Sequence, residues 1–130
     1  MADKRLEEAQ LLYENKYYDA AYYLSGYAIE FALKAVICRR LNVEIFDSSQ
    51  VSKRIASPFQ IHELPILVVF SGLQVELSNK KNLDADFDAA WSLVSQWNEI
   101  RRYEEGCSQK TAKEFSIGTN TLLSWIKTYW

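Results

Sequence analysis

Apolar side chains recur at three- and four-residue steps along most of the chain, and this spacing predicts helices. A short first helix is expected to begin with Asp3 as its N-cap and to end where Asn15 and Lys16 interrupt the pattern. The longest run extends from Tyr18 to Leu41 and predicts a second helix of about 36 Å. Gly26 lies within this run and indicates close packing or tolerance by the surrounding core. The apolar stripe of this helix comprises Ala21, Leu24, Ala28, Phe31, Ala32, Ala35 and Cys38.

Three further helices are expected after a connector at residues 42 to 61, where the apolar period is lost. The third begins at His62 or Glu63 and reaches Leu77. The fourth begins near Asp84 and continues to Gly106, and the capping-box pattern from Thr111 to Glu114 lies in the first turns of the fifth. The sequence therefore predicts an all-α fold: an antiparallel four- to five-helix up-and-down bundle, forming one domain over residues 1–130.

Composition and charge narrow the class of protein. Hydrophobic residues make up 48% of the 130 residues and charged residues 25%, a balance typical of soluble globular domains. The formal net charge of −2 supplies no overall positive field for nucleic acid, so RNA binding needs a local basic cluster, and no DNA-specific signal is present. Two cysteines, Cys38 and Cys107, match no metal-ligand spacing and fit a reducing cytosol. Since no apolar run approaches about 18 residues, we expect a cytoplasmic protein, neither secreted nor membrane-spanning.

Few residues suit catalysis. The sequence lacks a glycine-rich phosphate loop, a nucleophile elbow and an H-E-x-x-H helix, and we expect no cofactor and no metal. His62 is the only histidine, which excludes a mechanism that needs two imidazoles within one protomer. A Cys–His nucleophile pair stays formally open, although Cys38 on the apolar stripe is better interpreted as a small core residue than as an activated thiolate.

Glu30 and Lys34 lie four residues apart on the predicted long helix, in the favourable order for an ion pair. One interpretation is an ordinary salt bridge on the helix surface. The other places Glu30 partly inside the protein, where its carboxylate needs a donor such as His62 or an arginine of the fourth helix.

Two adjacent arginines and a tyrosine, Arg101, Arg102 and Tyr103, close the apolar pattern of the fourth helix. Arginines at a helix C-terminus also complement the helix dipole, so a structural role is one interpretation. The functional interpretation is an anion site, because a guanidinium group binds phosphate through two hydrogen bonds and a tyrosine can stack on a base.

Six tyrosines are concentrated near the start of the second helix, and such aromatic clusters close the rim of a core or form a subunit interface. We expect them to contribute to a homodimer surface. They are Tyr13, Tyr17, Tyr18, Tyr22, Tyr23 and Tyr27.

Taken together, three segments of the sequence resemble the HEPN superfamily of small bacterial and archaeal helical domains, which are often encoded beside nucleotidyltransferases. The segments are the long-helix stretch from Ala21 to Ala35, the helix start from His62 to Leu67, and Trp97 followed by Arg102 and Tyr103. The resemblance implies a four- or five-helix bundle that forms a homodimer with a polar cleft at the subunit junction.

Many HEPN domains are similar to metal-independent ribonucleases, some of them toxins held in check by a partner, and rely on an Arg-x(4-6)-His motif beside an Arg-Tyr element. In one common form the arrangement reads Arg-x4-His-x-Arg-Tyr, and when its Arg-Tyr element is placed on Arg102 and Tyr103, the histidine position is occupied by Ile100 and the arginine position by Ser95. Isoleucine cannot transfer a proton or stabilise a phosphate, so the resemblance does not carry ribonuclease activity of the usual type to this chain.

The sequence supports three hypotheses. The first is a non-catalytic, dimeric HEPN-like domain that binds a nucleotide, RNA or a partner protein in a toxin–antitoxin or nucleotidyltransferase-associated system. Its binding residues are Arg101, Arg102, Tyr103 and Lys34, supported by Glu30 and His62. A partner nucleotidyltransferase could also modify Tyr103, as the resemblance suggests. The second is a ribonuclease with a rearranged site that uses His62 and Arg102, and the third is a purely structural assembly module.

Overall fold

The computed structural model describes residues 1–42, 61–100 and 106–130. Within these residues the chain forms helices and no strand, so the predicted all-α fold is confirmed. No helix in the described ranges is long and apolar enough to cross a membrane. The helices are α1 (Ala2–Glu14), α2 (Tyr18–Leu41), α4 (Leu64–Ser71), α5 (Gln74–Leu83), α6 (Ala85–Val94) and α7 (Gln109–Lys127).

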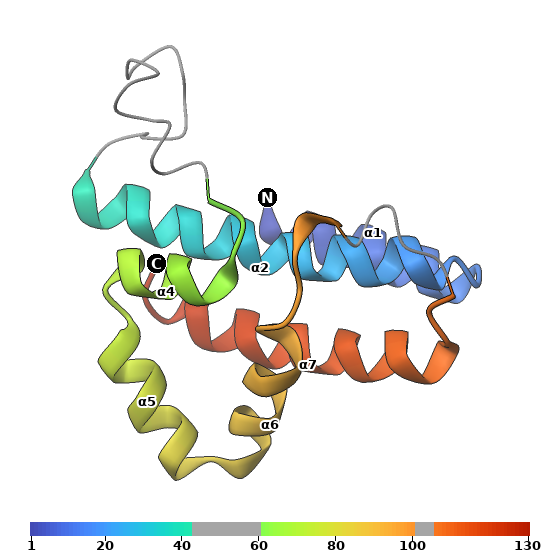
Figure 1. Ribbon diagram of the computed structural model, residues 1–130. Coiled ribbons are helices and arrows are strands. Elements are labelled where there is room, and N and C mark those ends of the chain that lie inside the picture. The colour runs from blue at the N-terminus through green and yellow to red at the C-terminus, as the bar shows by residue number, and fades with distance from the viewer. Residues whose placement is uncertain (43–60, 101–105) are drawn as a thin grey trace.

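Helix α2 is the centre of the fold (Figure 1). It packs against α1, α4 and α7, while α6 packs against α7 and α5 joins α4 to α6. The core therefore forms mainly between α2 and α7, with the shorter helices closing one side. The largest fully buried side chains include Trp97, Phe87, Phe115, Ile29, Leu33, Ile37 and Leu122.

The second helix has the bounds that the sequence predicts, Tyr18–Leu41. It ends because Asn42 adopts a left-handed conformation with φ of 54°, and Arg39 and Arg40 place positive charge in its last turn. Of the clustered tyrosines, Tyr22 is buried and stacks on Phe115 of α7 with ring centroids 3.8 Å apart. Tyr22 is thus a core residue of this chain and is not available for a subunit surface.

The predicted third helix is two helices. The chain leaves α4 at Gly72, whose φ of 75° lies in the left-handed region that favours glycine. Helix α5 then begins at Gln74. The described chain consequently has six helices, more than the expected four or five, although its class is unchanged.

The ends of the first and fourth predicted helices also differ from the ends that the structure shows. Asp3 lies inside α1, whose N-cap is Met1. Asp84 caps α6, since its side chain accepts a hydrogen bond from the Phe87 amide at 3.0 Å. Helix α6 stops at Val94, well before Gly106, so Trp97 lies beyond the helix.

Helix α7 begins with Ser108 as its N-cap, whose hydroxyl accepts from the Thr111 amide at 3.1 Å. The predicted capping-box segment therefore lies within its first turns. Asp19 of α2 accepts from the Cys107 amide at 2.8 Å, which ties the approach to α7 to the start of α2. At the other end, Lys127 of α7 pairs with Asp3 of α1.

Candidate functional site

The candidate site begins with Glu30, a carboxylate inside the protein. Glu30 lies on α2 and is 2% exposed. Its Oε1 accepts from the Lys34 ammonium at 2.7 Å and lies 2.9 Å from His62 Nδ1. Its Oε2 is buried and has no hydrogen-bond partner among the described residues. Burial of a carboxylate is costly, and here two donors that can carry positive charge converge on one oxygen to offset that cost.

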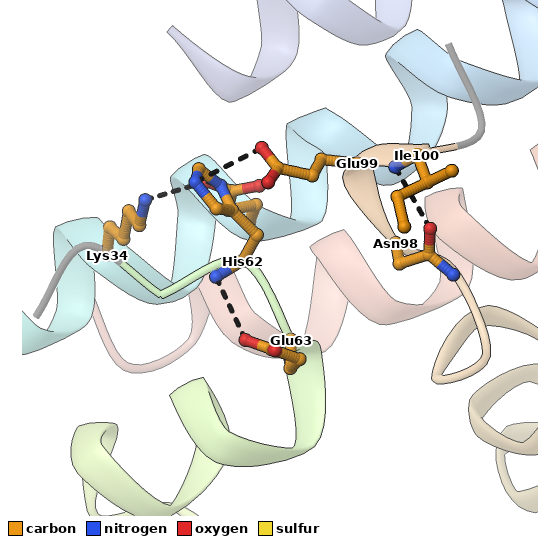
Figure 2. Close-up of polar contacts among 7 residues, drawn as sticks. Lys34, His62, Glu63, Asn98, Glu99 and Ile100 are labelled. Carbon is orange, nitrogen blue, oxygen red and sulfur yellow. Dashed lines mark hydrogen bonds and ion pairs between the residues drawn. The ribbon is translucent and has the colours of Figure 1, made fainter. Parts of the chain in front are cut away.

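His62 lies between two carboxylates. Its Nδ1 faces Glu30, and its Nε2 lies 3.2 Å from Oε2 of Glu99 (Figure 2). Ionised carboxylates only accept hydrogen bonds, so each can accept from a ring nitrogen that carries a proton. In this arrangement both ring nitrogens face carboxylates of the protein.

We use the name polar junction for Lys34, Glu30, His62 and Glu99. Basic and acidic side chains alternate along the chain of contacts, in the order Lys34, Glu30, His62 and Glu99. Its two carboxylates differ in burial, because Glu30 is inside the protein whereas the side chain of Glu99 is 45% exposed. The junction joins α2, the segment before α4 and the turn after α6.

His62 reaches the junction because α4 packs against α2. Glu63 is the N-cap of α4 in an extended conformation, with φ of −75° and ψ of 116°, and Pro65 lies in the first turn, where a missing amide hydrogen costs nothing. Leu64 and Leu67 are buried in the core. These contacts fix the start of α4. They therefore also fix the imidazole of His62, which lies two residues before the helix.

Glu99 reaches the junction through a close contact between Trp97 and Gly26. A Cβ atom at Gly26 would lie 2.3 Å from the Trp97 ring, so only glycine allows the indole to lie against α2 at this point. Trp97 is 1% exposed, and Gly26 is one turn before Glu30. The buried indole therefore anchors the segment that carries Glu99.

Ile100, which the resemblance would place at the histidine position of the HEPN motif, is 61% exposed. Its amide donates to Asn98 Oδ1 at 3.0 Å, a local turn visible in Figure 2. Arg101, Arg102 and Tyr103 follow directly in the sequence and lie outside the described residues. Ser95, which the resemblance would place at the arginine position of the motif, is the C-cap of α6.

The structure brings together three of the residues singled out from the sequence, Glu30, Lys34 and His62. The surface-salt-bridge interpretation of Glu30 is wrong, because its carboxylate is buried and shared. Glu99 was missed. A half-exposed glutamate after a tryptophan carries no pattern of its own, and only the fold brings it to His62.

No cluster of three or more metal-ligating side chains suited to a metal ion occurs in the described part of the chain. Cys38 and Cys107 are both half-buried. The residues that the structure describes therefore offer proton-bearing and charged groups but no cation site.

Comparison with known proteins gives one result. The HEPN domain family matches residues 1–57, a segment that contains α1, α2, Glu30 and Lys34. This match confirms the family resemblance expected from the sequence and ends before His62. No curated protein and no solved structure matches the chain.

Proposed function

Since residues 1–57 match the HEPN domain, we propose that this protein binds RNA or a nucleotide through its phosphate groups and does not cleave it. The observation that supports this proposal is the position of His62, the only histidine in the sequence, between Glu30 and Glu99. General acid–base catalysis needs a ring nitrogen that exchanges a proton with the substrate. Both nitrogens of His62 are instead directed at carboxylates of the protein.

In this proposal the phosphate-binding groups are Arg101 and Arg102, with Tyr103 stacking on a base. Their placement in the site is argued from the sequence, since Arg101 comes two residues after Glu99 of the polar junction. Guanidinium groups bind phosphate through paired hydrogen bonds, and aromatic rings bind bases without sequence preference. Lys34 contributes positive charge, but its ammonium already pairs with Glu30, so the arginines provide most of the affinity.

Titration of the purified protein with fluorescent single-stranded RNA and with ATP tests binding. The double variant Arg101→Ala/Arg102→Ala is expected to weaken binding at least about tenfold, because two phosphate contacts are lost. The matched control is Arg39→Ala/Arg40→Ala, which removes two adjacent exposed arginines at the end of α2 and leaves the affinity within about twofold. Affinity must also fall as salt increases. Equal losses in the two double variants, or no binding at low salt, would contradict the proposal.

The same RNA, analysed for cleavage, decides between binding and the rearranged ribonuclease. Intact RNA after prolonged incubation is expected. Cleavage that disappears in both His62→Ala and Arg102→Ala, with a rate governed by one group near neutral pH, would replace the binding proposal with the ribonuclease.

A further inference from the structure

A groove of about 470 Å³ runs between α6 and α7, away from the residues of the polar junction. Its floor is formed by small residues, Ala90 and Gly118, and its sides include Leu93 and Ile117. Ile117 is 59% exposed, although it is a large apolar side chain. Exposed apolar surface of this kind is typical of interaction sites.

Two acidic residues lie at opposite ends of this groove. Helices α6 and α7 are antiparallel, because Phe87 contacts Trp125 while Gly118 lies against Ala90 and Val94. Asp86 is therefore at one end of the groove, and Glu114 is at the other. Among the residues that the structure describes, no lysine or arginine lines the groove.

The charges of the two acids are available to a partner. Glu114 has a single weak ion pair, with Lys110 at 3.9 Å, and the Lys110 side chain is 85% exposed. Asp86 forms no ion pair with any residue in the described ranges. Neighbouring Asp84 differs, because its carboxylate is used to cap α6.

From these observations we propose that the α6–α7 groove binds an amphipathic helix of a partner protein, with basic residues on either side of its apolar face. Apolar side chains at three- and four-residue spacing would fill the space over Ala90 and Gly118, as helices do in hydrophobic grooves. Basic residues at both ends of the partner segment would pair with Asp86 and Glu114. This proposal is independent of the RNA-binding proposal, which concerns other residues.

Other occupants fit the groove less well. Nucleic acid and anionic membranes would meet two carboxylates and, within the described ranges, no basic side chain. A second copy paired about a two-fold axis would place the acidic ends of one groove against those of the other, which is repulsive. Charge complementarity therefore favours a basic partner helix.

The probe is a synthetic helical peptide with leucines at three- and four-residue spacing and lysines near both ends. Fluorescence anisotropy at low salt is expected to show saturable binding. A peptide with glutamates in place of the lysines is expected to bind at least about tenfold more weakly, because its charges repel those of the groove. A peptide with serines in place of the leucines should not bind.

Two matched pairs of variants test whether the probe binds in the α6–α7 groove. Asp86→Lys is expected to weaken binding about five- to tenfold, whereas Asp88→Lys, the same change on the same helix outside the groove, changes it less than about twofold. Ile117→Ser is expected to weaken binding about tenfold, and Val75→Ser, at another exposed apolar residue, leaves it unchanged.

Three outcomes would overturn the proposal. They are no binding up to about 1 mM probe, equal effects within either pair of variants, and a dimer in sedimentation that Ile117→Ser dissociates, which would make a second copy the occupant. The Ile117→Ser variant retains the residues assigned to RNA, so its RNA affinity is expected to be unchanged. RNA titration of this variant therefore distinguishes failure of the groove proposal from failure of the RNA-binding proposal.

Discussion

At the polar junction the carboxylates of Glu30 and Glu99 face His62 from both sides, whereas in the α6–α7 groove Asp86 and Glu114 flank apolar surface with little to neutralise them. The two regions have similar residues but different partners. A carboxylate that is paired inside the fold fixes the positions of helices, because its removal leaves other charges uncompensated. An unpaired carboxylate beside an open groove contributes little to folding and is free to select a ligand by charge.

Replacement of Glu30 is the strongest test of the first region. Glu30→Gln is expected to lower the free energy of unfolding by about 2–3 kcal/mol, because Lys34 loses the charge that compensates it and the contact of Glu30 with His62 is weakened at a buried position. Denaturant unfolding measures the change. The control Glu8→Gln, which breaks a partly exposed pair with Arg5, is expected to cost less than about 1 kcal/mol. Similar losses in both variants would mean that the junction is no more than a surface salt bridge.

The anchor beneath the junction is tested by Gly26→Ala. Alanine normally stabilises a helix relative to glycine by about 1 kcal/mol. At Gly26 the new methyl group would lie 2.3 Å from the Trp97 ring, so we expect a net loss of about 1–3 kcal/mol and altered tryptophan fluorescence. Gly118→Ala is the matched control. Its nearest neighbour is Val94 Cγ2 at 3.1 Å, and we expect stability to be unchanged or raised. A stable Gly26→Ala variant with native fluorescence would contradict the close contact.

The smallest expected effect concerns Asp84, an acidic residue beside the groove whose carboxylate caps α6. The hydrogen bond from the Phe87 amide, aided by Lys80, holds the pKa of Asp84 below its ordinary value of 3.8. A lowered pKa means that the carboxylate stabilises the fold above pH 3.8 and that this contribution is lost as the pH falls through the lower folded value. Asp84→Asn should therefore destabilise the protein at neutral pH and lose this effect in acid, as measured by urea unfolding. Asp86→Asn, which removes no cap, should change stability less at neutral pH. An Asp84→Asn effect that is the same at all pH values would argue against the charged cap.

The sequence was sufficient to predict the long helix but not every helix end. The bounds of α2 follow from an uninterrupted apolar period between Lys16 and Asn42, both of which adopt positive φ. The break between α4 and α5 was missed because apolar residues continue on both sides of Gly72, so the period gave no sign of a stop. Trp97 was assigned to a helix on spacing alone. Its burial against Gly26 depends on the turn after α6, which spacing does not encode.

The candidate site was also predicted only in part, because spacing along the chain does not encode contacts that depend on the fold. The pairing of Glu30 with Lys34 is local, since the two residues are four apart on one helix. The contact of Glu30 with His62 joins residues 32 positions apart and became a prediction only because a buried carboxylate needs a donor. No such requirement indicated Glu99, which is partly solvated and could have remained unpaired.

The packing of α7 against α1 and α2 has a consequence for synthesis of the chain on the ribosome. The stretch that matches the HEPN family emerges early, yet the buried face of α2 includes Tyr22, whose stacking partner Phe115 is translated much later. For several seconds the nascent helix pair exposes the apolar surface that α7 covers in the complete fold. We expect chaperones to bind the nascent chain during this interval and to be released once α7 docks.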